Sequence, residues 1–215
     1  MKVKIKNIKS IFTYDIESNS IINLGNKELL IDNGVIIKIK DNINYDENII
    51  DANGYAITPG FIDCHTHPIF TSNRAKEFEM RCLGKNYQDI ANQGGGINSS
   101  VKSLRDADYT NLYESSLYNI KQLVSNGSTT IESKSGYGLS VKDEIKSLKI
   151  INEINNSIDA NIIPTFMGAH AFPPEYINNK DAYIDIICEE MIPEVSQQGL
   201  AEFCDVFCEE GYFSI

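Results

Sequence analysis

Residues 58–68 read Thr-Pro-Gly-Phe-Ile-Asp-Cys-His-Thr-His-Pro, and the rest of the chain is best interpreted from this stretch. The apolar residues within 57–62 surround a Pro-Gly break and stop before Pro68, which predicts a short strand. His65 and His67 stand two residues apart at its C-terminal end. In extended backbone such side chains share a face, about 6–7 Å apart. Both imidazoles can therefore lean onto one metal ion.

The chain has only three histidines and places two of them in this pair. Zinc and iron bind neutral imidazole nitrogen readily, and a catalytic ion needs a rigid strand end with an open coordination position. The competing interpretation is a pair of ordinary polar residues in a turn. The sequence favours the metal site.

Composition limits the classes of partner. The chain has 215 residues, 42% of them hydrophobic and 23% charged, as in globular proteins. Its net charge of −11 argues against nucleic acid and against an anionic membrane surface. The N-terminus has no apolar signal core, and no run reaches the roughly 20 apolar residues of a membrane span. We expect a cytoplasmic protein whose five cysteines are buried free thiols, because they form no CxxC pair.

Residues 1–56 have the pattern of β-structure. Asn33-Gly34 and Asn53-Gly54 each stand between apolar runs, and Asn-Gly suits a type I′ hairpin turn because both residues need positive φ. We find no chemistry in this segment. It is predicted to form a small separate β unit ahead of a domain spanning 57–215.

Helices and strands alternate after His67. Apolar periodicity and caps predict helices over 108–125, 141–155 and 181–198. Short β-branched or apolar runs predict strands near 129–132, 161–167 and 204–208. Strands separated by helices call for a parallel sheet. Their spacing suits successive units of a βα barrel, although an open doubly wound sheet remains an alternative.

The histidines follow predicted strands. His65 and His67 end the first strand, His170 follows the third, and Tyr137 lies in a Gly-Tyr-Gly turn after the second. In a parallel α/β fold these positions meet at the carboxyl edge of the sheet, where active sites are built. For Tyr137 and His170, ordinary packing roles are equally compatible with the sequence. Their convergence is the stronger signal.

The long loop after the first strand carries Arg74 and Tyr87. Arginine grips a carboxylate with two hydrogen bonds, and Arg74 lies only seven residues beyond the histidine pair. A solvated surface charge is the alternative for Arg74. Five glutamates could each hydrogen-bond to site residues without contacting the ligand, or could simply face solvent: Glu132, Glu189, Glu190, Glu209 and Glu210.

Residues 58–68 resemble the first-strand signature of the amidohydrolase superfamily of metal-dependent barrel enzymes. Further strings follow in order: HTHPIFTSNRAKEFEMR, IANQGGGI, TTIESKSGYGL, FMGAHAFPPEY, DAYIDIICEEMIP and DVFCEEGYFS. Together they resemble the imidazolonepropionases, the ring-opening hydrolases of histidine breakdown, almost collinearly from Pro59 to the end. The resemblance implies the first half of a (β/α)8 TIM barrel preceded by a small β-sandwich segment.

The resemblance also implies roles. His65 and His67 match the first two ligands of one Zn²⁺ or Fe³⁺ ion. Arg74 matches a contact to the substrate's propionate, Tyr137 and His170 match substrate contacts, and Tyr87 is a weaker candidate of that kind. The implied reaction hydrolyses the cyclic amide C–N bond of 4-imidazolone-5-propanoate, giving N-formimidoyl-L-glutamate. A homodimer is one assembly compatible with this reading.

Length separates this chain from that family. About 160 residues hold four βα units, whereas a closed barrel needs eight and about 250 residues. Two histidines are fewer than the three protein ligands of a catalytic zinc site. We therefore expect the catalytic groups on a missing C-terminal half, and this chain alone to be incomplete and inactive. Two rivals remain: another amidohydrolase, such as a purine or triazine deaminase, whose substrate has no carboxylate for Arg74, and a non-catalytic half-barrel.

Overall fold

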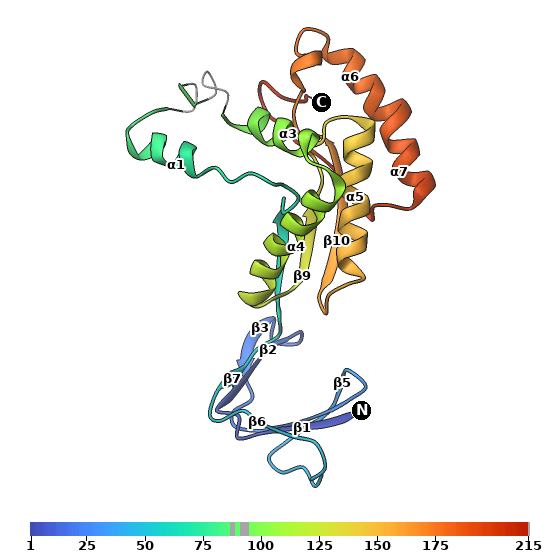
Figure 1. Cartoon of the computed structure of the whole chain (residues 1–215). Helices are drawn as coiled ribbons and strands as arrows, with labels where there is room; N and C mark the ends of the chain where they lie inside the picture. Colours follow the sequence, from blue (N-terminus) through green and yellow to red (C-terminus); the bar gives the residue numbers. More distant parts are fainter. Residues whose placement is uncertain (87–88, 91–94, 215) are drawn as a thin grey trace. The chain divides into compact units, whose positions relative to one another are not determined.

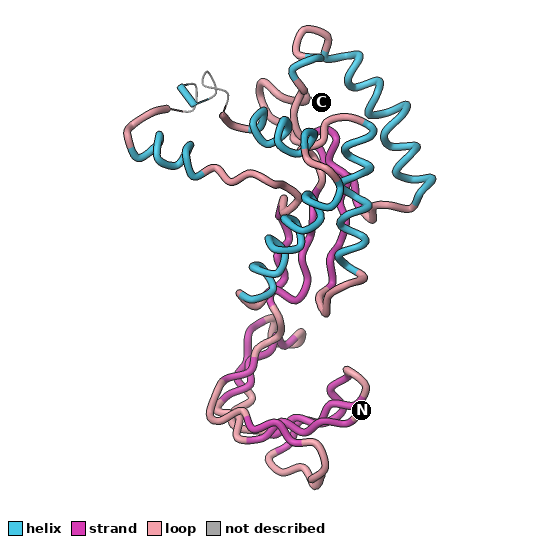
Figure 2. The backbone as a smooth tube through the Cα atoms, in the orientation of Figure 1, coloured by secondary structure: helices cyan, strands magenta, loops and turns pink. Residues whose placement is uncertain are grey.

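A computed structural model of the chain describes residues 1–86, 89–90 and 95–214. It divides into two compact units, Met1–Gly60 and Phe61–Ile215. The first is built of strands and loops, and the second alternates strands with helices (Figure 2). The boundary falls between Gly60 and Phe61, slightly later than the sequence indicated, because Ile57 pairs with Ile11 inside the first unit.

The N-terminal unit contains two small sheets. Its strands are β1 (Lys2–Lys6), β2 (Ser10–Asp15), β3 (Ser20–Asn23), β4 (Glu28–Asp32), β5 (Val35–Lys40), β6 (Ile49–Asp51) and β7 (Ala56–Ile57). One sheet has the order β5-β4-β1-β6 and the other β3-β2-β7. Ile8, Ile11 and Leu29 form the buried core of this unit.

Both Asn-Gly turns adopt the backbone that the sequence predicts. Asn33 and Gly34 have φ of 47° and 81°, and they join the antiparallel strands β4 and β5. Asn53 and Gly54 have φ of 49° and 80°. The strands beside this second turn do not pair with each other, because β6 runs parallel to β1 and β7 parallel to β2. The turn therefore links two sheets and closes no hairpin.

The second unit is organised on four parallel strands. They are β8 (Phe61–Thr66), β9 (Ser128–Lys134), β10 (Asn161–Ala169) and β11 (Phe203–Val206), in the order β11-β10-β9-β8. The helices are α1 (Ala75–Cys82), α3 (Ile97–Asp106), α4 (Tyr109–Ser125), α5 (Val141–Asn155), α6 (Lys180–Ile186) and α7 (Ile192–Gln198). A short 3₁₀ turn, Pro174–Tyr176, precedes α6. The parallel α/β organisation predicted from the sequence is confirmed.

Helices α4 and α5 begin where their caps indicate. The Asp108 side chain accepts a hydrogen bond from the Asn111 amide, and the Ser140 side chain accepts one from the Asp143 amide. Both helices pack along the middle of the sheet, α4 against β9 and α5 against β10 (Figure 1). The core between them is fully buried and consists mostly of aliphatic side chains, including Leu112, Ile120, Ile131, Leu148, Ile151 and Ile162.

Two sequence expectations need correction. The helix predicted over 181–198 contains a π-helical turn, Ile187–Met191, between α6 and α7. Pro193 stands just inside α7 and has no N–H to continue the regular ladder. The cysteines are also all exposed, not buried. Cys64 and Cys204 are exposed because they lie on the two outermost strands of the sheet.

The described residues include no helix with the length and apolar composition that crossing a membrane requires.

Candidate metal and substrate site

The histidine pair lies at the carboxyl end of strand β8. His65 is in the last residues of the strand and His67 follows it directly. Their ring centroids are 5.7 Å apart in an edge-to-face arrangement. His65 is exposed and His67 is partly buried. Within the part of the chain that the structure describes, no group of three or more histidine, cysteine or acidic side chains could hold a metal ion.

Local hydrogen bonding decides which ring nitrogen of His67 carries the proton. Its Nδ1 lies 3.0 Å from the carbonyl oxygen of Ser135. A carbonyl only accepts, so Nδ1 carries the proton and the lone pair on Nε2 is left for a ligand. Burial, with the nearby His170 as the next cause, lowers the pKa of His67 to about 3. The neutral imidazole that zinc or iron requires is thus favoured, and the pair fits as two ligands of a larger set.

Three rings from three strand ends form a cluster beside this pair. His67 stacks on His170 with centroids 4.4 Å apart and ring planes 12° apart. Tyr137 lies against both, at 5.3 Å from His67 and 5.4 Å from His170. His170 Nδ1 is 2.8 Å from the carbonyl oxygen of Gly136, so it too donates from Nδ1. The structure therefore brings together three of the residues singled out from the sequence.

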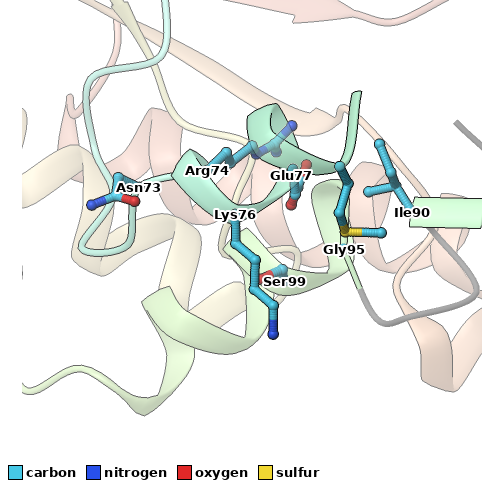
Figure 3. Close-up of a pocket in the computed structure, with 8 residues that line it drawn as sticks. Asn73, Arg74, Lys76, Glu77, Ile90, Gly95 and Ser99 are labelled. Carbon is cyan, nitrogen blue, oxygen red and sulfur yellow. The ribbon is translucent and has the colours of Figure 1, made fainter. Parts of the chain in front are cut away.

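Arg74 and Tyr137 line one cavity of about 350 Å³. Arg74 directly precedes α1, and its Nη2 donates to Ser100 Oγ at 2.9 Å. Burial raises the pKa of Tyr137, opposed by the charge of Arg74, so its hydroxyl stays protonated at neutral pH. Arg74 also lines a second cavity of about 270 Å³, where Lys76 and the buried Glu77 add charge (Figure 3). Tyr87, the remaining residue predicted to contact substrate, lies outside the described residues.

An ion cluster around the buried Lys134 spans the strands near the rings. Lys134 Nζ is 2.6 Å from Glu132 Oε1 and 2.7 Å from Asp205 Oδ2, and Thr165 donates to Glu132 Oε1 at 2.8 Å. Burial alone would lower the pKa of Lys134, but hydrogen bonds to the two carboxylates outweigh it and raise the pKa. The cluster thus joins β9, β10 and β11. The other four glutamates considered from the sequence are exposed: Glu189, Glu190, Glu209 and Glu210.

Sequence reasoning named Glu132 but not its partner Lys134 or Asp205, and it also missed a fully buried acid, Glu144. Glu144 is fully buried and contacts the loop that carries Tyr137. Burial raises the pKa of its carboxyl, whereas hydrogen bonds from the loop oppose that rise. A signal was available for Glu144, because it lies four residues beyond the Ser140 cap on the apolar side of a predicted helix. For Lys134 and Asp205, 71 residues apart, the sequence offers no comparable sign.

Comparison with known proteins gives one consistent result. No family model matches the sequence. An imidazolonepropionase from Clostridium tetani is 40% identical over 227 aligned residues, which cover 99% of this chain and 54% of that protein. One from Aliivibrio fischeri is 50% identical over 167 aligned residues, covering 78% of this chain and 41% of that protein. The chain spans about half the length of the curated relatives it matches.

Solved structures support the fold alone, since their identities are low. A mutant atrazine chlorohydrolase from Arthrobacter aurescens, crystallised with zinc and atraton, has a TM-score of 0.59 and 12% identity. The match covers 99% of this chain and 48% of that one. An N-isopropylammelide isopropylaminohydrolase from Burkholderia multivorans has a TM-score of 0.56 and 15% identity, covering 88% and 43%. The predicted first half of a (β/α) barrel is confirmed.

Proposed function

We propose that this chain, a homologue of the N-terminal half of imidazolonepropionases, supplies the substrate grip and two metal ligands of a cyclic amide hydrolase. The substrate is 4-imidazolone-5-propanoate and the product N-formimidoyl-L-glutamate, formed in the cytoplasm. The observation that carries the proposal is that Arg74 and Tyr137 share a cavity, while Tyr137 also lies against the rings of His67 and His170.

Each of these groups has a chemical task. The guanidinium of Arg74 can hold the propionate through paired, charge-assisted hydrogen bonds. The Tyr137 hydroxyl can donate to the imidazolone ring, and His170 Nε2 can accept from a ring N–H because Nδ1 already donates to Gly136. The substrate would then lie with its tail on Arg74 and its ring beside the three-ring cluster.

His65 and His67 would hold one Zn²⁺ or Fe³⁺ ion with ligands from elsewhere. When bound, such an ion supplies Lewis-acid chemistry: a nucleophile at neutral pH and stabilisation of developing negative charge. Because two histidines are fewer than the usual three protein ligands, we expect the 215 residues alone to show no turnover. The groups that move protons are expected outside this chain.

The test is a chimera in which residues 1–215 are followed by the remaining residues of the Clostridium tetani relative. It should hydrolyse imidazolonepropionate when loaded with zinc or iron, and His67→Ala should abolish this. Arg74→Ala should lower kcat/KM roughly 10- to 100-fold, because a charge-assisted pair contributes about 1.5–3 kcal/mol. Arg81→Ala, at an exposed position in α1, is the matched control and should change little.

Two outcomes would contradict the proposal. Unchanged kinetics in Arg74→Ala would show that Arg74 does not bind the propionate of the substrate. A folded, metal-loaded chimera that ignores imidazolonepropionate but deaminates guanine or a triazine would favour the rival amidohydrolase reaction.

A further inference from the structure

The loop between β9 and α5 wraps around a buried carboxylate. Glu144 lies in the first turn of α5 and is 0% exposed. Its Oε1 accepts the amide N–H groups of Gly138 and Leu139, each at 2.8 Å. The N–H of Gly136 reaches the same carboxylate, at 3.0 Å from Oε2 and 3.2 Å from Oε1. Three loop amides therefore converge on one side chain.

The carbonyl groups of the same loop are held from its other side by a cation. Arg105, near the end of α3, donates from Nε to the Gly138 carbonyl and from Nη2 to the Leu139 carbonyl, both at 2.7 Å. Its Nη1 pairs with Glu175 at 2.7 Å. The loop is thus fixed between an acceptor on one side and a fork of donors on the other.

The loop backbone needs this support. Leu139 has φ of 49°, a left-handed conformation that residues with side chains rarely adopt. A Cβ on Gly138 would come within 2.6 Å of the Asp143 backbone, and one on Gly136 within 2.8 Å of the Met167 carbonyl oxygen. The contacts from Glu144 and Arg105 therefore stabilise a backbone conformation that is unfavourable on its own.

What the loop presents explains why that conformation matters. The carbonyls of Ser135 and Gly136 accept from Nδ1 of His67 and of His170, and Tyr137 is the next residue. A shift of this segment would free both imidazoles to change tautomer and would move the tyrosine ring. The orientation of all three rings therefore depends on one short backbone segment.

We propose that Glu144 and Arg105 are positioning residues, which lock residues 135–139 so that His67 and His170 stay in the Nδ1–H tautomer beside Tyr137. Neither side chain is assigned a contact with substrate or metal. The importance of the rings rests on the proposed function, whereas the lock itself does not. Its test reads protons on imidazole nitrogens and needs no turnover, so it succeeds or fails independently of the chimera.

The experiment is ¹⁵N imidazole NMR on metal-free chain at about pH 8, above the ordinary histidine pKa of about 6.5. In wild type, His67 and His170 should each show a single Nδ1–H tautomer, and the exposed His65 serves as internal reference. Glu144→Gln keeps the size of the side chain but replaces one carboxylate oxygen with an N–H donor, which cannot accept from the loop amides. Both histidines should then shift toward mixtures containing the Nε2–H form.

The matched control is Asp143→Asn, a buried acid on the same turn, whose side chain bonds Ser140 and Lys146 and, among the described residues, has no hydrogen bond to the amides of 136–139. It should weaken α5 in thermal melts and leave both tautomers unchanged. Arg105→Gln, on the opposite side of the loop, should shift the tautomers in the same direction as Glu144→Gln and carries the test if that variant does not fold. Wild-type tautomers in a folded Glu144→Gln or Arg105→Gln chain would overturn the proposal, as would equal shifts in Asp143→Asn.

Discussion

The two middle strands of the parallel sheet differ sharply from the two outer ones. Ile131 in β9 and Ile162 in β10 are 0% exposed, beneath α4 and α5. Ile62 in β8 is 72% exposed and Phe203 in β11 is 60% exposed. Large apolar side chains are thus buried in the middle strands and exposed in the edge strands. Among the described residues, helices cover these positions of the middle strands and leave those of the edge strands uncovered.

The end of β8 that carries the candidate site is nevertheless tied to the middle. Thr66 Oγ1 donates to the Glu132 carbonyl at 2.7 Å, and His67 Nδ1 donates to the Ser135 carbonyl. The same strand therefore has exposed side chains at Phe61 and Ile62, and it has these extra side-chain hydrogen bonds where the histidine pair begins. We infer that hydrogen bonds to β9 and to the loop after it position the candidate site residues at the end of the edge strand β8.

The largest expected effect comes from deleting the same side chain in the two regions. Ile131→Ala should lower the free energy of unfolding by about 4 kcal/mol, since buried isoleucine deletions cost about 2–5 kcal/mol. Ile62→Ala, in the adjacent strand, should change it by less than about 0.5 kcal/mol, as surface substitutions do. Urea denaturation followed by circular dichroism measures both. Equal losses would mean that the edge is covered in solution.

A smaller loss is expected from the ion cluster. Lys134→Met keeps most of the volume but leaves Glu132 and Asp205 without their shared cation, and should cost about 3 kcal/mol. Lys149→Met, at an exposed position on α5, is the control and should stay within about 0.5 kcal/mol. A Lys134→Met chain as stable as wild type would show that the cluster does not join the strands energetically.

The sequence predicted the helices on the middle strands and the meeting of the three rings better than it predicted individual contacts between distant residues. The Ser140 cap and the apolar periodicity placed α4 and α5 within a residue. The meeting of His67, Tyr137 and His170 followed from topology, because parallel strands end at one edge.

What the sequence did not reveal depends on contacts between distant residues. The hydrogen bonds from Lys134 to Asp205 and from Arg105 to the Gly138 carbonyl join separate elements. No pattern within a short stretch of sequence predicts them. The exposure of the cysteines was mispredicted for the same reason. Whether Cys64 is buried depends on what covers strand β8, and propensity alone cannot decide that.

The smallest effect is a pH dependence at the outer strand. The hydrogen bond from Lys134 holds the pKa of Asp205 below its ordinary value of 3.8. Because the folded pKa is the lower one, the contribution is complete above about pH 4 and is lost as pH falls through the folded value. Asp205→Asn should therefore cost up to about 1 kcal/mol at neutral pH, discounted for the 40% exposed side chain, and nothing at strongly acid pH. The exposed Asp159→Asn is the control, and a pH-independent loss would contradict the assignment.

Hydrogen exchange of the backbone amides tests the central claim most directly, because it reports local opening strand by strand. Mass spectrometry of peptides spanning 128–134 and 161–169 should show slow exchange, and peptides spanning 203–206 and the first half of 61–66 should exchange at least about 100-fold faster. That pattern would establish a stable middle that carries the ring cluster and edges that open independently. Uniform protection of all four strands would contradict the account.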